Sequence, residues 1–279
     1  MISFRSILSA AAGLSMTAAA ILVVGATARS AQASTIILEG SDAIGFHCAF
    51  GDAGACTYRD EAFSAIGGAS PKPIAVFGNT VNGTPVTSGT HAVADFASVG
   101  AAGPLSNYVA LYFLAGSGCC EEDDSLITGN EAAVSAYLAA GGTVMIENYT
   151  GGSAWDFAIG AGGAGNAHVA GVGGGFPSSL SCDDGEKVTA DGILNGFTQP
   201  PTLGCWTHQG YDQSFFGPLG FTHNFFDSPL GLGIDGFSSL LSTGITVSNP
   251  ASGVPEPATL SIIGLGLAAL GLARRRKSA

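Results

Sequence analysis

Tyr108-Val-Ala-Leu-Tyr-Phe-Leu114 is a continuous apolar run whose length suits a β-strand buried on both faces. Thr128-Gly-Asn-Glu131 follows it and matches a capping box, in which the threonine is the N-cap of a helix over Ala132 to Ala140. Gly141 ends that helix, and Thr143-Val-Met-Ile146 is a second run of the strand type. A strand, a crossover helix and a strand make a βαβ unit, so we expect the two strands to be parallel.

The same pattern occurs nearer the N-terminus. Thr35-Ile-Ile-Leu38 and Pro73-Ile-Ala-Val-Phe77 are strand-like runs, and between them Asp60 to Ile66 predicts a short helix closed by Gly67-Gly68. Four strands that alternate with helices predict an α/β fold. We expect an open, mostly parallel sheet with flanking helices, of the Rossmann or flavodoxin kind.

The C-terminal half has a different composition and predicts irregular structure. Glycine accounts for 43 of the 279 residues and is dense from Gly160 to Gly175, where we expect loops. Ile245-Thr-Val247 is expected to add a last strand. Between residues 203 and 226 the chain is rich in aromatic side chains, which we expect to cover the edge of the sheet: Trp206, Tyr211, Phe215, Phe216, Phe221, Phe225 and Phe226.

Composition and charge exclude several classes of protein. Charged residues make up only 11% of the chain and apolar residues 46%, which rules out a disordered acidic chain and a coiled coil. Between residues 34 and 254, three basic side chains (Arg59, Lys72 and Lys187) are outnumbered by 20 acidic ones, a formal charge of −17. Such a segment repels phosphate backbones, so nucleic acid is excluded as a partner.

The first 33 residues have the features of a secretory signal helix. One positive charge precedes the apolar run Ile7 to Ala28, and Ala31-Gln32-Ala33 supplies the small residues that signal peptidase requires. We therefore expect cleavage after Ala33, with Ser34 as the new N-terminus. A membrane anchor is the alternative, and the polar segment Ser30 to Thr35 argues against it.

The C-terminal end carries three features in order. Val254-Pro255-Glu256-Pro257 precedes the apolar segment Ala258 to Ala273, and a basic cluster follows, formed by Arg274, Arg275, Arg276 and Lys277. As a helix the apolar segment is about 24 Å long, short of a hydrocarbon core of roughly 30 Å, but long basic side chains can extend its reach. Four positive charges after the span predict a cytoplasmic C-terminus, with residues 34–254 outside the cytoplasm.

Pro255-Glu256-Pro257, the short apolar helix and the terminal arginine cluster resemble the PEP-CTERM protein-sorting tail of Gram-negative bacteria. The resemblance implies recognition by exosortase, a membrane transpeptidase-like cysteine protease. It also implies removal of the tail and delivery to the outer surface, alongside exopolysaccharide production. On this basis the chain divides into a signal peptide (1–33), an exported α/β domain (34–248), a linker (249–254) and a sorting tail (255–279) with a transmembrane helix at 258–273.

All six cysteines lie in the segment that we expect to be exported: Cys48, Cys56, Cys119, Cys120, Cys182 and Cys205. An even number in an oxidising compartment favours disulfides. Cys48 with Cys56 would close a small local loop and Cys182 with Cys205 a longer one, whereas the adjacent pair could have separate partners or remain free. Zinc binding is the alternative, but there is no C-x-x-C pair and the histidines are not at ligand spacing.

The order of elements also resembles the class I glutamine amidotransferase-like fold, which includes ThuA-like proteins. In that family a helix ending in Gly-Gly leads to a strand and a sharp elbow, and Tyr137 to Ile146 followed by Glu147 to Gly151 is similar. Asp191 to Gly196 resembles a late segment of those domains. Catalytic members carry a cysteine at the elbow, where this sequence has Tyr149 or a neighbour. That departure argues against amidotransferase chemistry.

The motifs of catalysis and cofactor binding are incomplete. Gly160 to Gly165 fits G-x-G-x-x-G but lacks the strand before it and the helix after it. Gly152-Ser153 follows a predicted strand but lacks the second glycine of a serine-hydrolase elbow. We therefore expect no catalytic residue and no cofactor. The five histidines are scattered and cannot be assigned to a triad: His47, His91, His168, His208 and His223.

Two carboxylate runs and one pair of polar residues are candidate ligand sites. Glu121, Glu122, Asp123 and Asp124 follow a predicted strand, at the edge of an open α/β sheet where ligands bind. They could hold a hard cation such as Ca²⁺, although the EF-hand spacing is absent and a solvated loop is the alternative. Asp183-Asp184-Gly-Glu186 is a second run of this kind. Asp42 and His47 follow the first predicted strand. They could form a small-molecule site, and a structural loop is the alternative.

Three functions remain open. The first is an exported, disulfide-bonded, non-catalytic protein of the cell surface or extracellular matrix. Its partners would be signal peptidase, exosortase and exopolysaccharide, and it would pass through an intermediate tethered to the inner membrane. The second is a divergent hydrolase-like enzyme on an amidotransferase-like scaffold, and the third is a carbohydrate-binding protein, suggested by the aromatic residues 203–226. Buried aromatic side chains without a convergent polar pocket would favour the first.

Overall fold

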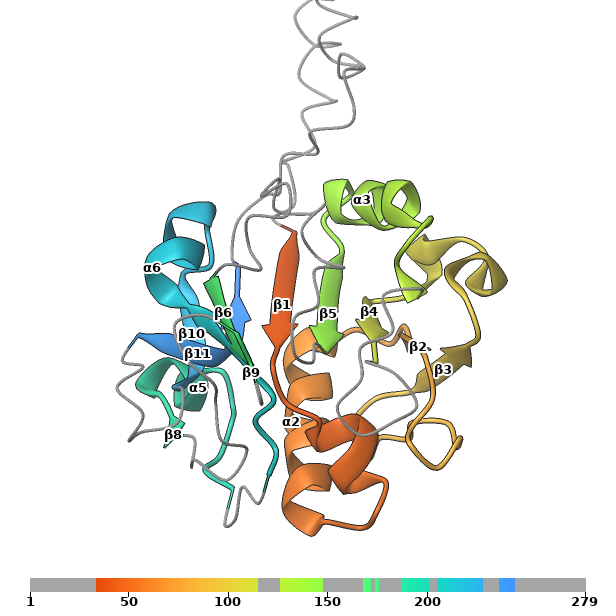
Figure 1. The fold of residues 1–279 in the computed structure, drawn as a ribbon. Coiled ribbons are helices and arrows are strands. Elements are labelled where there is room, and N and C mark those ends of the chain that lie inside the picture. Colours follow the sequence, from red (N-terminus) through yellow and green to blue (C-terminus); the bar gives the residue numbers. More distant parts are fainter. Residues whose placement is uncertain are drawn as a thin grey trace, which may run out of the picture. The chain divides into compact units, whose positions relative to one another are not determined.

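The computed structural model describes residues 34–114, 126–147, 168–171, 174–175, 187–200, 205–227 and 236–243. These residues form a mixed α/β fold around one sheet, with a parallel part and an antiparallel part (Figure 1). The parallel part has the strand order β3 (Val93–Phe96), β2 (Ile74–Phe77), β4 (Ala110–Phe113), β5 (Thr143–Glu147) and β1 (Thr35–Glu39).

The predicted βαβ unit is confirmed. Helix α3 (Glu131–Ala139) lies between β4 and β5 in the chain, and the two strands pair in parallel with Ala110 opposite Thr143. On its other side β5 pairs in parallel with β1, with Glu39 opposite Glu147. The expectation of an open, largely parallel α/β sheet therefore holds for this part of the molecule.

The antiparallel part corrects the expectation of an irregular C-terminal half. Strand β11 (Phe237–Ser242) pairs antiparallel with β1, β9 (Gln209–Asp212) and β10 (His223–Asp227). Beyond them lie β6 (Val169–Gly171), β7 (Gly174–Gly175) and β8 (Lys187–Val188). These strands are short or mix serine, glycine and other polar residues with apolar ones, so they lack the continuous apolar runs that mark buried strands in a sequence. The expected strand Ile245–Val247 lies outside the described residues.

Short helices connect or flank the strands. The longest described helix is α2 (Ala53–Gly67), which follows a π-helical segment η1 (Ala43–Cys48). Apart from η1 and α3, the other described helices have five residues or fewer. They are η2 (Val99–Ala102), η3 (Leu105–Asn107), α5 (Ala190–Leu194), α6 (Gln213–Phe216) and η6 (Gly217–Leu219).

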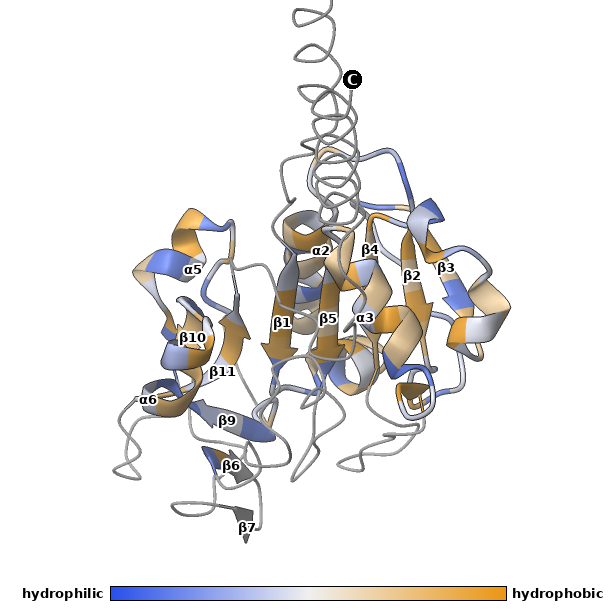
Figure 2. Cartoon of the chain, turned by 90° about the horizontal axis from the view of Figure 1, so that it is seen from above, coloured by the Kyte–Doolittle hydropathy of each residue, from blue (hydrophilic) through white to orange (hydrophobic). Residues whose placement is uncertain are grey.

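Each face of the parallel strands has its own hydrophobic core, because alternate residues of a strand point to opposite faces. Apolar residues follow one another along β1, β5 and β2 (Figure 2). Helix α3 covers one face, where Tyr137 and Leu138 belong to the same core as Leu38 and Phe77. Helix α2 covers the other: Tyr58, Phe63 and Ile66 pack with Ile37, Val76 and Tyr112.

Two helix starts differ from the sequence-based expectation. Helix α2 begins at Ala53, not Asp60, because the Asp52 side chain caps it by accepting from the backbone N–H groups of Gly54 (2.8 Å) and Ala55 (3.2 Å). The capping box at Thr128 is wrong: the N-cap of α3 is Asn130, which makes no side-chain cap bond. Gly129 has a φ of +82°, a left-handed conformation that cannot begin a right-handed helix.

No helix among the described residues is long and apolar enough to cross a membrane. The predicted signal helix at 1–33 and the predicted transmembrane helix at 258–273 lie outside those residues.

Candidate functional site

The carboxyl ends of two adjacent parallel strands each carry a buried glutamate. Glu39 ends β1 and Glu147 ends β5, and they are opposite each other in the ladder. Tyr112 of β4 joins them: its hydroxyl lies 3.0 Å from Glu39 Oε2 and is also hydrogen-bonded to Glu147 Oε2. The three side chains are at most 2% exposed. The sheet topology thus brings together three ionisable groups far apart in sequence.

The hydrogen-bonding capacity of each group explains how the three side chains can be buried together. The Tyr112 hydroxyl has one proton and can donate it fully to only one of the two carboxyl oxygens. Two adjacent buried carboxylates repel each other, so a hydrogen-bond donor between them reduces the free-energy cost of burying both. Burial and the negative charges of Glu147 and Glu39 raise the pKa of Tyr112 well above its usual value, so the phenol stays neutral. Ser41 Oγ donates to Glu39 Oε1 at 2.9 Å and extends the network.

A second polar cluster lies on the chain that leaves β1. The Asp42 carboxylate lies 3.2 Å from His47 Nε2 and 3.1 Å from His208 Nε2. Asp42 and His208 are buried, and the side chain of His47 is 18% exposed. Burial acts to lower the pKa of His47, but the hydrogen bond and charge of Asp42 outweigh it, so the pKa is raised above 6.5. Sequence analysis grouped Asp42 and His47 after the first strand, and the structure places them in contact and adds His208.

A glycine at the end of β1 brings His208 into this cluster. The carbonyl of Gly40 accepts the backbone N–H groups of His208 (2.7 Å) and Gln209 (2.8 Å), which ties the chain before β9 to the end of β1. A Cβ on Gly40 would lie 1.9 Å from the Gln209 carbonyl oxygen, so no larger residue fits there. His47 Nε2 also lies 3.1 Å from the carbonyl oxygen of Cys205 on the same segment.

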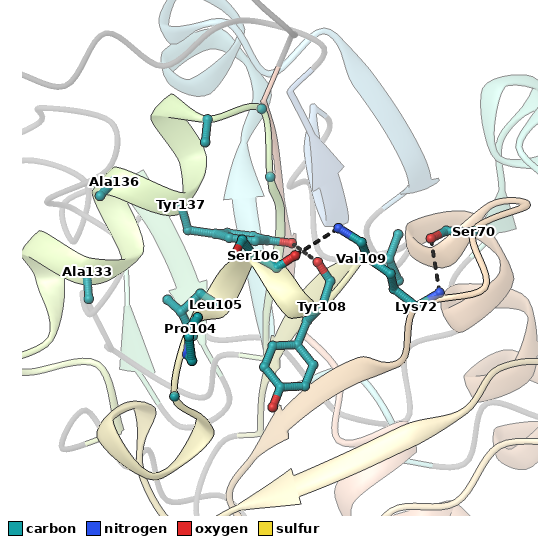
Figure 3. Close-up of a pocket in the computed structure, with 14 residues that line it drawn as sticks. Ser70, Lys72, Pro104, Leu105, Ser106, Tyr108, Val109, Ala133, Ala136 and Tyr137 are labelled. Carbon is teal, nitrogen blue, oxygen red and sulfur yellow. Dashed lines mark hydrogen bonds between the residues drawn. The ribbon is translucent and has the colours of Figure 1, made fainter.

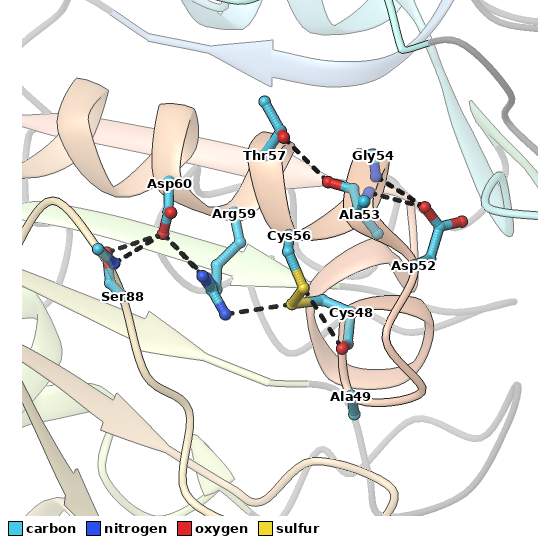
Figure 4. Close-up of a disulfide and its surroundings, with 12 residues drawn as sticks. Cys48, Ala49, Asp52, Ala53, Gly54, Cys56, Thr57, Arg59, Asp60 and Ser88 are labelled. Atoms are coloured by element: carbon cyan, nitrogen blue, oxygen red, sulfur yellow. Dashed lines mark hydrogen bonds and ion pairs between the residues drawn. A yellow bond between two sulfur atoms is a disulfide. The ribbon is translucent and has the colours of Figure 1, made fainter.

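A disulfide fixes η1, which carries His47, to helix α2. Cys48 and Cys56 are bonded, as one of the pairings considered from the sequence (Figure 4). Arg59 of α2 donates to Cys48 Sγ at 3.1 Å and contacts Asp60 Oδ1 at 3.0 Å. Burial acts to raise the pKa of Asp60, but Arg59 and the backbone N–H of Gly89 outweigh it and lower that pKa. Cys205 is also disulfide-bonded.

Most other predicted sites lie outside the described residues. They are the acidic runs 121–124 and 183–186, Tyr149, Ser153, the glycine motif 160–165, and Cys119, Cys120 and Cys182. His168 and His223 are described but pair elsewhere, with Asp212 (3.2 Å) and Asp191 (2.9 Å). Within the described ranges no group of three or more His, Cys, Asp or Glu residues could hold a metal ion.

Sequence reasoning missed Glu39, Tyr112 and Glu147, although a signal was present. Thr35-Ile-Ile-Leu-Glu39 and Thr143-Val-Met-Ile-Glu147 both end a buried apolar run with a glutamate. A charged residue at the end of a strand that is buried on both faces must find a partner at the same edge of the sheet.

A cavity lies at the opposite edge of the sheet, by the amino ends of β2, β4 and β5. It has a volume of about 650 Å³ and lies between α3, with Ala136 and Tyr137, and the chain around Tyr108 (Figure 3). Lys72 donates to the Ser106 carbonyl at 2.8 Å, and Tyr137 donates to the Tyr108 carbonyl at 3.3 Å. These polar groups are satisfied within the protein and do not converge on a common point in the cavity.

Comparison with known proteins assigns the tail. Residues 253–277 match the model of the PEP-CTERM protein-sorting motif. This motif marks an exported protein that exosortase targets and that is sorted to the cell surface. No curated protein and no solved structure matches the chain, so the resemblance to the amidotransferase-like fold has no support.

Proposed function

We propose that the chain is a non-catalytic protein of the outer surface or extracellular matrix. A signal peptide at 1–33 directs export, and exosortase removes the tail from an intermediate held in the inner membrane. The observation that carries the proposal is the match of residues 253–277 to the sorting motif. The tail indicates how the protein is exported and sorted, and the α/β domain indicates what kind of protein is exported.

The burial of the aromatic side chains supports a structural domain over a carbohydrate-binding platform. Such platforms use exposed rings on which ligands stack. Here Trp206, Tyr211 and Phe216 are at most 1% exposed, and Phe221, Phe225 and Phe226 at most 4%. Trp206, Phe225 and Phe226 belong to the core under α2, and Tyr211, Phe216 and Phe221 belong to the core under α3. Phe215 is half-buried against the core under α3, so these rings do not form an exposed stacking platform.

The polar clusters at the carboxyl ends of β1 and β5 support the same conclusion. A catalytic site must present its groups to substrate, and a hydrolase also needs a nucleophile beside a general base. Glu39, Tyr112 and Glu147 are buried, with the Tyr112 hydroxyl hydrogen-bonded to both glutamates, and the Asp42 carboxylate lies between two histidines. This arrangement satisfies buried charge and favours structural stability over chemistry.

The three parts of the tail sequence suggest separate roles during sorting. Pro255 and Pro257 remove backbone donors and keep the segment around Glu256 extended, so that a protease can bind it at the membrane surface. The apolar residues 258–273 hold this segment at the membrane. The basic cluster 274–277 keeps the helix from sliding outward.

Replacing Pro255, Glu256 and Pro257 by alanine tests this role. The variant should still enter the membrane but escape processing, so that full-length chain accumulates in the membrane fraction. The matched control replaces Ser248, Asn249 and Ser252, just before the motif, by alanine and should be processed normally. Mass spectrometry of the C-terminal peptide of surface-released protein gives the result. Residues 258–279 intact on released, unsubstituted protein would contradict the proposal.

A further inference from the structure

A small cavity lies where the end of β1, strand β11 and the segment before β9 meet. Its lining is Ser41, Tyr58, Trp206, Phe226, Ser239 and Leu240, each at most 5% exposed. The volume is about 10 Å³, close to the minimum that one water molecule requires. No solute with more than one heavy atom fits.

Two polar groups of this lining have no hydrogen-bond partner among the residues that the structure describes. They are Trp206 Nε1–H and Ser239 Oγ, on side chains that are 1% and 2% exposed. A buried polar group without a partner costs about 1–3 kcal/mol, and native structures rarely leave one. Two such groups around a single cavity point to a common ligand inside it.

The chemistry of the lining defines that ligand. Trp206 Nε1–H can only donate, so the ligand must accept a hydrogen bond, which excludes a metal cation. The Ser41 hydroxyl gives its proton to Glu39 Oε1 and accepts the Ala43 N–H at 3.4 Å, so one lone pair remains for a donor. A ligand of one heavy atom that both accepts and donates hydrogen bonds is water.

We propose that this cavity is the binding site of one structural water molecule. The water accepts from Trp206 Nε1–H, donates to Ser41 Oγ, and forms a third hydrogen bond with Ser239 Oγ. Three bonds are typical of a buried water. The water thereby connects Trp206 and β11 to the chain of hydrogen bonds formed by Ser41, Glu39, Tyr112 and Glu147, and so links the antiparallel and parallel parts of the sheet.

A high-resolution crystal structure of the exported protein tests the site directly. We expect electron density for a solvent atom within hydrogen-bond distance of both Trp206 Nε1 and Ser239 Oγ. A cavity without such density overturns the proposal. This measurement needs no variant and does not depend on how well any variant folds.

The Ser239→Ala variant tests the energetic role of the water by the sign of its effect. If Ser239 Oγ had no partner, its removal would leave the urea midpoint of unfolding unchanged or higher. If Ser239 binds the water, the midpoint falls, and we expect this fall. The control, Ser106→Ala, removes an exposed hydroxyl and should leave the midpoint unchanged. A midpoint for Ser239→Ala at or above that of the unsubstituted protein overturns the assignment of Ser239 as a ligand.

Discussion

A tyrosine hydroxyl is what allows two glutamates to end adjacent buried strands. Tyr112 separates the carboxyl groups of Glu39 and Glu147 with a hydrogen bond to each, and Ser41 satisfies a further oxygen of Glu39. Without that hydroxyl, both carboxyl groups would remain buried and each would lose its hydrogen bond to Tyr112. Removing one member of such a network therefore lowers the stability of the folded state more than removing two members that bond to each other.

We expect Tyr112→Phe to lower the free energy of unfolding by about 2–3 kcal/mol, because it leaves buried carboxyl oxygens without their donor. The double variant Tyr112→Phe/Glu147→Gln should recover part of that loss, since an amide replaces one of the two acids. Urea unfolding of both variants measures the difference. A double variant less stable than Tyr112→Phe alone would show that the two carboxyls do not compete for one proton.

Tyr137 makes stability depend on alkaline pH. Burial raises the pKa of Tyr137 from 10 to about 12, and its side chain is 9% exposed in the core under α3. The folded state holds this proton more tightly than the unfolded chain does. The stabilisation is therefore complete below pH 10 and is lost as the pH rises from 10 to 12, by about 2–3 kcal/mol over that range.

The Tyr137→Phe variant should lose less stability over that range than the unsubstituted protein. Urea unfolding at pH 9 and pH 11.5 measures both slopes. Tyr112 remains in the variant, so some alkaline loss persists. Equal slopes for the two proteins would contradict the assignment to Tyr137.

At the scale of elements, sequence analysis identified the strands that are continuous apolar runs and missed those that mix polar with apolar residues. β1, β2, β4 and β5 are apolar runs, and this pattern is visible without the fold. β11 carries Ser238, Ser239 and Ser242, all buried. Ser238 Oγ is satisfied by Asn224 and by the Phe226 carbonyl on β10, partners that only the folded sheet brings near.

Like the strands, the candidate site could be predicted from the sequence only in part. Asp42 and His47 are five residues apart after a predicted strand, so their proximity follows from the sequence. His208 comes from a segment about 160 residues away, and long-range backbone contacts of Gly40, Ser41 and Asp42 with that segment place it beside Asp42. Such long-range placement depends on the antiparallel strands, which the sequence pattern did not reveal.

The disulfide should stabilise the junction of η1 and α2. Cys48 and Cys56 are eight residues apart, and closing so short a loop contributes about 2–3 kcal/mol in the chain-entropy model. We expect the double variant Cys48→Ser/Cys56→Ser to lose that amount in urea unfolding. The single helix-cap variant Asp52→Asn, which keeps an acceptor at the start of α2, is the control and should lose less. An unchanged double variant would show that the loop is fixed without the bond.

At the scale of the whole molecule, β1 is the strand on which both parts of the sheet depend. It pairs with β5 on one side and β11 on the other, whereas β3 pairs only with β2 among the described strands. Ile36 N–H donates to Thr243 Oγ1 (2.9 Å), and Thr243 N–H donates back to Ile36 O (2.9 Å). These contacts span 207 residues of chain.

We expect the backbone amides of Ile36–Leu38 to be among the slowest to exchange with solvent, because they open only when the whole sheet unfolds. Amides of Val93–Phe96 at the edge should exchange much faster. Hydrogen–deuterium exchange followed by mass spectrometry of peptides from both strands measures this difference. Equal protection of the two peptides would mean that the sheet does not unfold outward from β1.

The central position of β1 has a consequence for the timing of assembly. A chain that is synthesised, or threaded through a membrane, from its N-terminus presents Thr35–Glu39 first and Phe237–Ser242 last. Strand β1 can pair with β5 once Thr143–Glu147 is present, but its other edge stays open to wrong pairing and aggregation until β11 arrives. The sorting motif begins at residue 253, only eleven residues after β11 ends. The last strand and the sorting motif thus emerge almost together, so that the sheet can close only at about the moment when the chain becomes ready for release.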